Sequence, residues 1–305
     1  MAIPKDIREK IDELKKQYDA LRSGKEALLD IVSEAELPEA VYNSNAIENS
    51  TLTISETEKI LLNLEVSRDV SVREVFEAKN LAQVYEYIKN KVSTRTIDKE
   101  LLLLLHKMLI GNIDESIAGR FRKQREYVRV GTHIAPAPEH VELMLDAALL
   151  EYSSNNIAYF LEKIAKFHLD FEHIHPFNDG NGRMGRVLIN YQLMQIGFAP
   201  LIIRDKEKQT YYSSFGEYRD KKKANTMERV LSAALMESLQ KRITYMKGEK
   251  IIRLSDYAKK HELSSPVLLN KAKRQTIPAF REKGIWKIGE GFVYKNENEQ
   301  SNNKI

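Results

Sequence analysis

The sequence predicts a mainly α-helical protein with one inserted β-hairpin and a small C-terminal domain. Apolar residues recur at helical spacing through most of residues 5–247, and strand-like alternation is confined to two short stretches. The third observation is a basic stretch at the C-terminal end. We therefore expect a core at 1–248, a small domain at 249–295 and a polar, disordered tail at 296–305.

Composition limits the function classes. The 305 residues are 42% hydrophobic and 30% charged, which is ordinary for a soluble globular protein, and the net charge is only +4. The absence of cysteine excludes disulfides and thiolate metal sites. The N-terminus is charged and no apolar run is long enough to cross a bilayer. We expect a cytoplasmic protein that does not bind membranes.

Helical spacing of apolar residues predicts the elements of the core in order. Residues 5–34 are expected to form one or two amphipathic helices that pack on their own domain or, less commonly, present a dimer surface. The segment Ser55–Glu58 has capping-box spacing and predicts a helix start. Apolar stripes predict helices at 70–90 and 97–110, and His106 in the second stripe is expected to be structural.

Residues 119–138 differ from the helical segments around them. Alternation at Tyr127–Val130, followed by Gly131 and two nearby prolines, predicts a small β-hairpin, which by itself could be an ordinary connection. A helix is expected after Pro138, and a long amphipathic helix at 226–247 is expected to close the core.

The densest polar chemistry lies between two helix-periodic apolar runs. Two helices joined by a glycine-rich connection form an anion cradle, because the second helix begins with free N–H groups and a positive dipole end. Arg183 and Arg186 are three residues apart and can bind successive phosphates. Asp179 offers an oxygen ligand for magnesium, and His175 has an ordinary pKa suited to proton abstraction.

These residues indicate a nucleotide-phosphate site with its own general base. One alternative is a plain helix–loop–helix turn with surface arginines and a capping Asp. A second is a metal site made of His173, His175 and Asp179, although it lacks a further convergent ligand. So many polar and glycine positions in twelve residues favour the functional interpretation.

The stretch from His175 to Arg186 resembles the signature of the Fic family, His-x-Phe-x-Asp/Glu-Gly-Asn-Gly-Arg-x-x-Arg, at every fixed position. The resemblance covers roughly residues 40–245. It implies a Fic-type helical core and transfer of AMP from ATP to a hydroxyl of a protein. It also implies that His175 deprotonates that hydroxyl and that Asp179 holds Mg²⁺.

The same resemblance implies how the phosphates are bound. The backbone of the glycine-rich turn forms the anion hole, the first arginine binds the leaving pyrophosphate, and the second holds the γ-phosphate. The intact anion hole favours nucleotidyl over phosphoryl transfer. The residues concerned are Gly180, Asn181, Gly182, Arg183 and Arg186.

A second motif precedes the core. Helical spacing places Ser44 and Glu48 on one face, which alone would be an ordinary helix end. The segment Ser44–Asn49 resembles the inhibitory pattern of the family, Ser/Thr-x-x-x-Glu-Gly/Asn. The resemblance implies that Glu48 pairs with Arg186 and competes with the γ-phosphate for the same donors.

Two further assignments come from the resemblance. It implies that the hairpin is a flap that pairs with the target backbone through Thr132, His133 and Ile134, as an exposed strand edge can. It also implies that Tyr212 helps to line the nucleobase pocket, although packing in the core or on the surface is an equal alternative.

Residues 249–295 predict a winged-helix-like domain with two short helices and a strand pair. Eleven Lys/Arg against five Asp/Glu give this segment a surplus of +6 (11 − 5 = 6). A basic helix-turn-helix can bind DNA phosphates, but no base-reading residue stands out. The domain therefore predicts either DNA binding or a scaffold or target-docking role.

Together these expectations describe a magnesium-dependent protein adenylyltransferase that is restrained by Glu48. Its substrates are ATP and a protein, which could be the chain itself, and a homo-oligomer is compatible with the sequence. Three alternatives stay open: removal of AMP from a modified protein, use of another nucleotide donor, and a DNA-binding regulator. The sequence does not identify the target, the modified hydroxyl or the oligomeric state.

Overall fold

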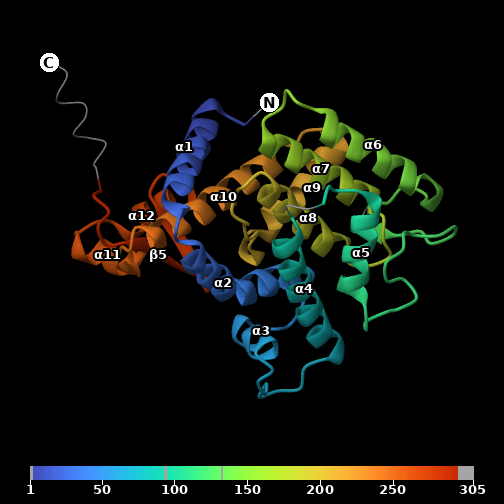
Figure 1. The fold of residues 1–305 in the computed structure, drawn as a ribbon, viewed down its shortest axis with the longest axis horizontal. Coiled ribbons are helices and arrows are strands. Elements are labelled where there is room, and N and C mark those ends of the chain that lie inside the picture. Colours follow the sequence, from blue (N-terminus) through green and yellow to red (C-terminus); the bar gives the residue numbers. More distant parts are fainter. Residues whose placement is uncertain (1–2, 93–94, 132, 295–305) are drawn as a thin grey trace.

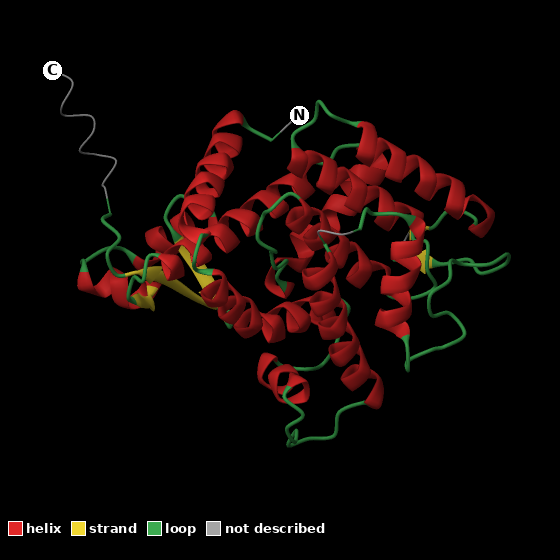
Figure 2. Ribbon diagram, viewed as in Figure 1, coloured by secondary structure: helices red, strands yellow, loops and turns green. Residues whose placement is uncertain are grey.

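A computed structural model describes residues 3–92, 95–131 and 133–294. Most of the described chain is helical (Figures 1 and 2), which confirms the predicted fold class. The first half of the core contains α1 (Lys5–Arg22), α2 (Glu26–Ile47), α3 (Ile54–Leu61), α4 (Val72–Lys91) and α5 (Lys99–Ile110). The second half contains α6 (Val141–Ser154), α7 (Phe160–Ile174), α8 (Asn181–Gln195), α9 (Lys208–Lys221) and α10 (Asn225–Met246).

Two short helices and the predicted hairpin complete the core. Helices η1 (Pro138–His140) and η2 (Asp205–Glu207) are 3₁₀ turns that precede α6 and α9. The hairpin consists of β1 (Arg129–Val130) and β2 (His133–Ile134), paired antiparallel. It lies at the opposite end of the molecule from the C-terminal segment (Figure 2).

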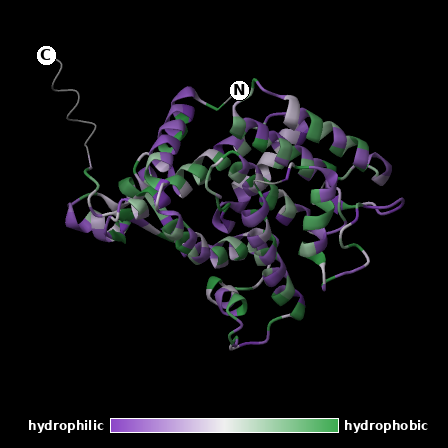
Figure 3. Ribbon diagram, in the orientation of Figure 1, coloured by the Kyte–Doolittle hydropathy of each residue, from purple (hydrophilic) through white to green (hydrophobic). Residues whose placement is uncertain are grey.

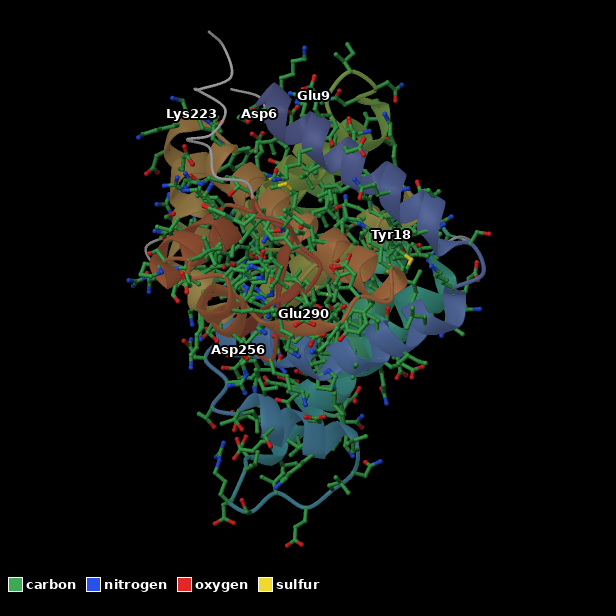
Figure 4. All side chains as sticks on the ribbon, turned by 90° about the vertical axis from the view of Figure 1, so that its left-hand side faces the viewer. Asp6, Glu9, Tyr18, Lys223, Asp256 and Glu290 are labelled. Carbon is green, nitrogen blue, oxygen red and sulfur yellow. The ribbon has the colours of Figure 1, made fainter. Side chains whose placement is uncertain are left out.

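Helices α7 and α8 are the centre of the core, because both apolar clusters include them. One cluster joins them to α4, α5 and α6, and the other joins them to α1 and α10. Helix α1 packs along α10, and Figure 4 shows Asp6, Glu9 and Tyr18 along α1. The helices carry hydrophobic and hydrophilic residues on different faces (Figure 3), as amphipathic packing requires.

The structure corrects one predicted helix start. The N-cap of α3 is Thr53 rather than Ser55, because the Thr53 side chain accepts a hydrogen bond from the Glu56 backbone N–H. The Glu56 carboxylate in turn accepts one from the Thr53 N–H at 2.8 Å, which completes a capping box two residues earlier. Ser55 therefore lies in the first turn of the helix.

The C-terminal segment contains β3 (Ile251–Arg253), α11 (Leu254–Lys260), α12 (Ser265–Lys273), β4 (Ala279–Glu282) and β5 (Ile285–Gly289). These elements form an antiparallel sheet of order β3-β5-β4 around a small apolar cluster. We call residues 251–294 the C-terminal module. The prediction included the two helices and the later strand pair but not β3. The expected tail at 296–305 lies outside the described residues.

Candidate active site

A cavity of about 540 Å³ lies where α7, α8, α9, the end of α2 and the hairpin meet. Its lining includes His175, Gly182 and Arg186 of the predicted motif, and Glu48 and Tyr212 from other elements. The fold thus gathers side chains from positions more than 150 residues apart into one pocket. A cavity of this size suits a nucleotide-sized ligand.

His175 lies at the C-terminal end of α7 in the left-handed conformation, with φ of 51°. Its Nδ1 lies 3.4 Å from the carbonyl oxygen of Glu172, and its own carbonyl accepts a hydrogen bond from Arg122 Nε at 2.8 Å. Burial lowers the pKa of His175 to about 4. The imidazole is therefore neutral at physiological pH, as a general base must be.

Arg122 donates hydrogen bonds to several backbone carbonyls around His175. The buried guanidinium also donates to the carbonyls of Ile174, Pro136 and Glu126. It therefore connects the C-terminal end of α7 to both stems of the hairpin.

The connection between α7 and α8 leaves a helix N-terminus open. Gly180 has a positive φ of 79° at the N-cap position and supplies no side chain to cap the helix. The Asn181 side chain braces the loop, since it accepts from Phe177 N–H and donates to the Phe177 carbonyl. The first backbone N–H groups of α8 thus lack intrahelical acceptors and can receive an anion.

Asp179 and Arg183 belong to a closed ring of four charged side chains. Arg183 pairs with Asp179 at 3.2 Å and with Glu77 at 3.1 Å. Arg73 of α4 pairs with Glu77 at 3.0 Å and also with Asp179. Burial opposes ionisation of Asp179, but the pKa of this carboxyl is lowered because Arg183 and Arg73 stabilise its charge.

The backbone of Asp179 is fixed by His106. The Gly119 N–H donates to His106 Nδ1, so Nε2 carries the ring proton and donates to the Asp179 carbonyl at 3.0 Å. The His106 ring also stacks on Phe177 with 3.7 Å between centroids. These contacts agree with the structural role predicted for His106.

Arg186 is held by two residues of α2. Its Nε donates to Ser44 Oγ at 2.9 Å, and its Nη2 donates to the Ser44 carbonyl and to Glu48 Oε1, each at 2.8 Å. Burial works against the charged guanidinium, but the pKa of Arg186 is raised because Glu48 stabilises the charge. A Cβ on Gly182 would lie 2.2 Å from Glu48 Oε1, so glycine is required for this approach.

Two donors in the site have no partner among the described residues. They are Arg183 Nε and Arg186 Nη1, and both are buried. Buried donors without acceptors are costly, so their presence beside an open helix N-terminus indicates that the site is shaped for an anion.

Glu172 lines the same cavity one helical turn before His175. Burial and the neighbouring Glu48 raise the pKa of its carboxyl to about 8, so it is largely protonated at neutral pH. Its Oε2 lies 3.9 Å from His175 Nδ1, and Oε1 has no partner among the described residues.

The remaining predicted site residues occupy different places. Tyr212 lines the cavity and donates to the Ile47 carbonyl at 2.7 Å, so it also holds the end of α2. His133 contacts the His173 carbonyl at 3.1 Å, whereas Ile134 is exposed on the hairpin. Thr132 lies outside the described residues.

The alternative metal site does not form. Within residues 3–92, 95–131 and 133–294, no group of three His, Cys, Asp or Glu side chains could hold a metal ion. His173 instead stacks on His133 with 5.0 Å between ring centroids.

Four residues of the site were not predicted: Arg73, Glu77, Arg122 and Glu172. Arg73 and Glu77 have the i, i+4 spacing of an ordinary surface ion pair, and nothing in the sequence connects α4 to the motif. Sequence position alone could have drawn attention only to Glu172, which lies on the face of α7 that ends in His175.

Comparison with known proteins agrees with this geometry. The profile of the Fic/DOC family matches residues 96–193. A curated relative from Nematostella vectensis, "Protein adenylyltransferase Fic", is 32% identical over 69% of this chain. A solved Fic domain-containing signaling protein from Bacteroides thetaiotaomicron is 26% identical, with a TM-score of 0.70, and covers 79% of this chain and 98% of that one.

The matches differ in extent. The chain spans 49% of the length of the Nematostella relative, so it is similar to about half of that protein. A Fic family protein from Desulfovibrio desulfuricans is 21% identical with a TM-score of 0.64, and it covers 97% of this chain and 99% of that one. This last likeness extends the shared fold into the C-terminal module. No helix among the described residues is long and apolar enough to cross a membrane.

Proposed function

Because this chain belongs to the Fic family, we propose that it is a protein adenylyltransferase that transfers AMP from ATP to a hydroxyl side chain of a protein. One observation carries the proposal above all. The cavity brings together the neutral imidazole of His175, Gly182 in the first turn of an uncapped helix and Arg186, which has an unpartnered buried donor.

His175 is the proposed general base. The target oxygen attacks the α-phosphorus, the bond to the bridging oxygen breaks, and pyrophosphate leaves while the hydroxyl proton passes to His175 Nε2. The backbone carbonyl of Glu172 lies beside His175 Nδ1 and favours the tautomer that carries the ring proton on Nδ1. Nε2 is then free to accept the proton of the target hydroxyl. Hairpin residues Val130 and His133 line the cavity, and we propose that the flap presents the target hydroxyl.

Negative charge grows on the leaving pyrophosphate during this step. We assign the backbone N–H groups of Gly180, Asn181 and Gly182 and the Arg183 side chain to its stabilisation, because fixed donors there lower the barrier. Arg186 is the proposed partner of the γ-phosphate. Tyr212 is proposed to border the nucleobase, next to its contact with α2.

Asp179 is the proposed Mg²⁺ ligand. Its low-pKa carboxylate fits a hard cation, and because Glu77 of the same ring is paired with Arg73 and Arg183, the nucleotide phosphates would complete the coordination. When bound, the ion would neutralise phosphate charge and orient the triphosphate. Asp179 holds its position for this through the His106 contact to its backbone.

Glu48 is the proposed inhibitor of the same site. Its Oε1 accepts a hydrogen bond from Arg186 Nη2, a donor that we assign to the γ-phosphate. The same oxygen lies close to Gly182 in the proposed anion hole. Charged hydrogen bonds contribute about 1.5–3 kcal/mol, which is enough to reduce turnover roughly tenfold to a hundredfold. Ser44 supports the proposed inhibition because its hydroxyl and carbonyl oxygens hold the Arg186 guanidinium beside Glu48.

The test is the intact mass of purified Glu48→Gly protein after incubation with ATP and Mg²⁺. We expect one AMP adduct on the chain itself or on an added target, and no adduct on the matched Glu48→Gly/His175→Ala protein. An adduct that persists without His175 would contradict the assigned base. Equal activity of the parent and Glu48→Gly proteins would contradict inhibition.

Other activities of the same site are separable by experiment. Removal of AMP would appear as AMP released from a pre-modified protein, and another donor would appear in a nucleotide screen of Glu48→Gly. Among the described residues, contacts within the chain argue against the DNA-binding alternative. The turn between β4 and β5, which serves as a wing in winged-helix proteins, is occupied: Gly284 N–H donates to Glu39 and Lys283 pairs with Glu58.

A further inference from the structure

Arg73 has no role in the proposed chemistry, yet it forms an ion pair with Asp179, the carboxylate that is proposed to bind the metal ion. Its Nη2 donates to Asp179 Oδ2. The other oxygen, Oδ1, already accepts from the Gly180 N–H at 2.6 Å and from Arg183 Nη2 at 3.2 Å. Both oxygens of Asp179 are therefore engaged, one by its own loop and one by a residue of α4.

A divalent cation at Asp179 Oδ2 would lie next to the guanidinium of Arg73, which already donates to that oxygen. A metal ion binds the oxygen lone pair at short range and repels a guanidinium nearby. Oδ1 is the less available atom, because its donors belong to the turn that forms the phosphate cradle. Repulsion between the two cations therefore favours release of Arg73 when a metal ion binds Asp179.

Arg73 can release Asp179 more easily than Arg183 can. The side chain of Arg73 is 55% exposed and that of Arg183 is 4% exposed. Ion pairs of exposed arginines are weak and exchange readily. Its second partner, Glu77 at 3.0 Å, lies one turn along α4 and keeps the guanidinium close to the site after it releases Asp179.

We propose that Arg73 is an exchangeable residue of this site, which holds Asp179 in the absence of metal ion and moves to the phosphates of the nucleotide when a divalent cation takes Asp179. The inference rests on the proposed function, because it requires Asp179 to bind the cation. The new anion beside Arg73 is then the part of the triphosphate that leaves as pyrophosphate. A guanidinium matches phosphate oxygens in a bidentate manner.

The proposal predicts opposite effects of one substitution on two ligands. In Arg73→Gln, Mn²⁺ alone should bind roughly twofold to fivefold tighter, because the competing exposed ion pair is gone. Inorganic pyrophosphate, added at saturating Mn²⁺, should bind about tenfold weaker, because a charged hydrogen bond is lost. Electron paramagnetic resonance of free Mn²⁺ and calorimetry of pyrophosphate measure the two affinities on the full chain.

Lys79→Gln is the matched control. It removes one positive charge from the same helix, and Lys79 contacts Asn63 rather than the site. Both affinities should stay within a factor of two of the parent. Equal thermal midpoints of the two variants and the parent would show that each protein is folded.

Asp179→Asn separates this inference from the proposed function. If Asp179→Asn binds Mn²⁺ like the parent even when pyrophosphate is present to complete the coordination, Asp179 is not the metal ligand, and both the metal assignment and the proposed role of Arg73 are wrong. If Asp179→Asn loses Mn²⁺ but Arg73→Gln changes both affinities in the same sense, or changes neither, the metal assignment survives and the exchange is overturned.

Discussion

His175 and Glu172 lie one helical turn apart, and burial moves their pKa values in opposite directions. The imidazole loses its proton more easily, with a pKa of about 4, and the carboxyl keeps its proton up to a pKa of about 8. Both groups are therefore neutral at physiological pH. A pocket meant for a polyanion benefits, because an uncharged Glu172 does not repel phosphate and an uncharged His175 can accept the hydroxyl proton.

The depressed pKa of His175 predicts an unusual pH profile. In the Glu48→Gly background, kcat/KM for AMP transfer should stay flat from about pH 7 down to about pH 5, because the base is protonated only as pH falls towards 4. Glu48 raises the pKa of His175, so its removal extends the flat region further. Loss of half the activity near pH 6.5, the ordinary histidine value, would contradict this expectation.

Glu172 predicts a pH-dependent stability. Its pKa is raised from 4.5 to about 8, so the folded state holds a proton that the unfolded state has lost, and the stabilisation declines as pH rises through 8. Glutamine in Glu172→Gln does not ionise, so the variant lacks this loss of stability. The groups that face residue 172 in the buried site are Glu48, Arg186, His175 and Tyr211. Urea denaturation should show the variant gaining stability relative to the parent between pH 5.5 and pH 8.5, and an unchanged difference would argue against a raised pKa.

At the scale of elements, the sequence predicted local structure well and contacts between distant segments poorly. Helix α8 with its uncapped N-terminus follows from a motif whose residues are adjacent, and the order of helices follows from apolar spacing. The pairing of Glu48 with Arg186 was anticipated only through family resemblance. Arg73 reaches Asp179 from 106 positions away, and no local pattern encodes that contact.

Helix α2 offers a test of the proposed inhibition that leaves the Glu48 carboxylate unchanged. Ser44→Ala removes the Oγ acceptor of Arg186 Nε but leaves Glu48 and the Ser44 carbonyl in place. One hydrogen bond contributes about 0.5–1.5 kcal/mol, so basal AMP transfer should rise roughly twofold to tenfold. This gain should remain below that of Glu48→Gly in the same assay. A decrease would mean that Ser44 supports Arg186 in turnover rather than in inhibition.

At the scale of the molecule, the C-terminal module is joined to α2 by buried charges. Arg204 pairs with Glu39 of α2 and, at 3.0 Å, with Glu237 of α10. Glu237 in turn pairs with Arg281 of β4 at 2.6 Å. In the sequence these residues look like ordinary surface charges, so the network could not be predicted. Glu39 lies nine positions before Glu48, so the contacts that hold the module also support α2.

Glu237 is the central carboxylate of this network. Its oxygens accept four hydrogen bonds from the backbone and side chain of Arg281 and one from Arg204. Glu237→Gln leaves both guanidinium groups short of a buried counter-charge, which should lower the free energy of unfolding by about 3 kcal/mol. Glu290→Gln is the matched control, because its pairs with Lys250 and Lys260 are exposed and should cost under about 1 kcal/mol.

Substitution of Glu237 should also change the rate of AMP transfer. If the module supports α2 through Glu39, Glu237→Gln should raise basal AMP transfer and expose the 247–250 connection to limited proteolysis, whereas Glu290→Gln should change neither. Combining Glu237→Gln with Glu48→Gly is decisive, because the first substitution acts through the restraint that the second removes. The double variant should be no faster than Glu48→Gly alone. Additive gains would mean that the module influences catalysis by a route that does not pass through α2.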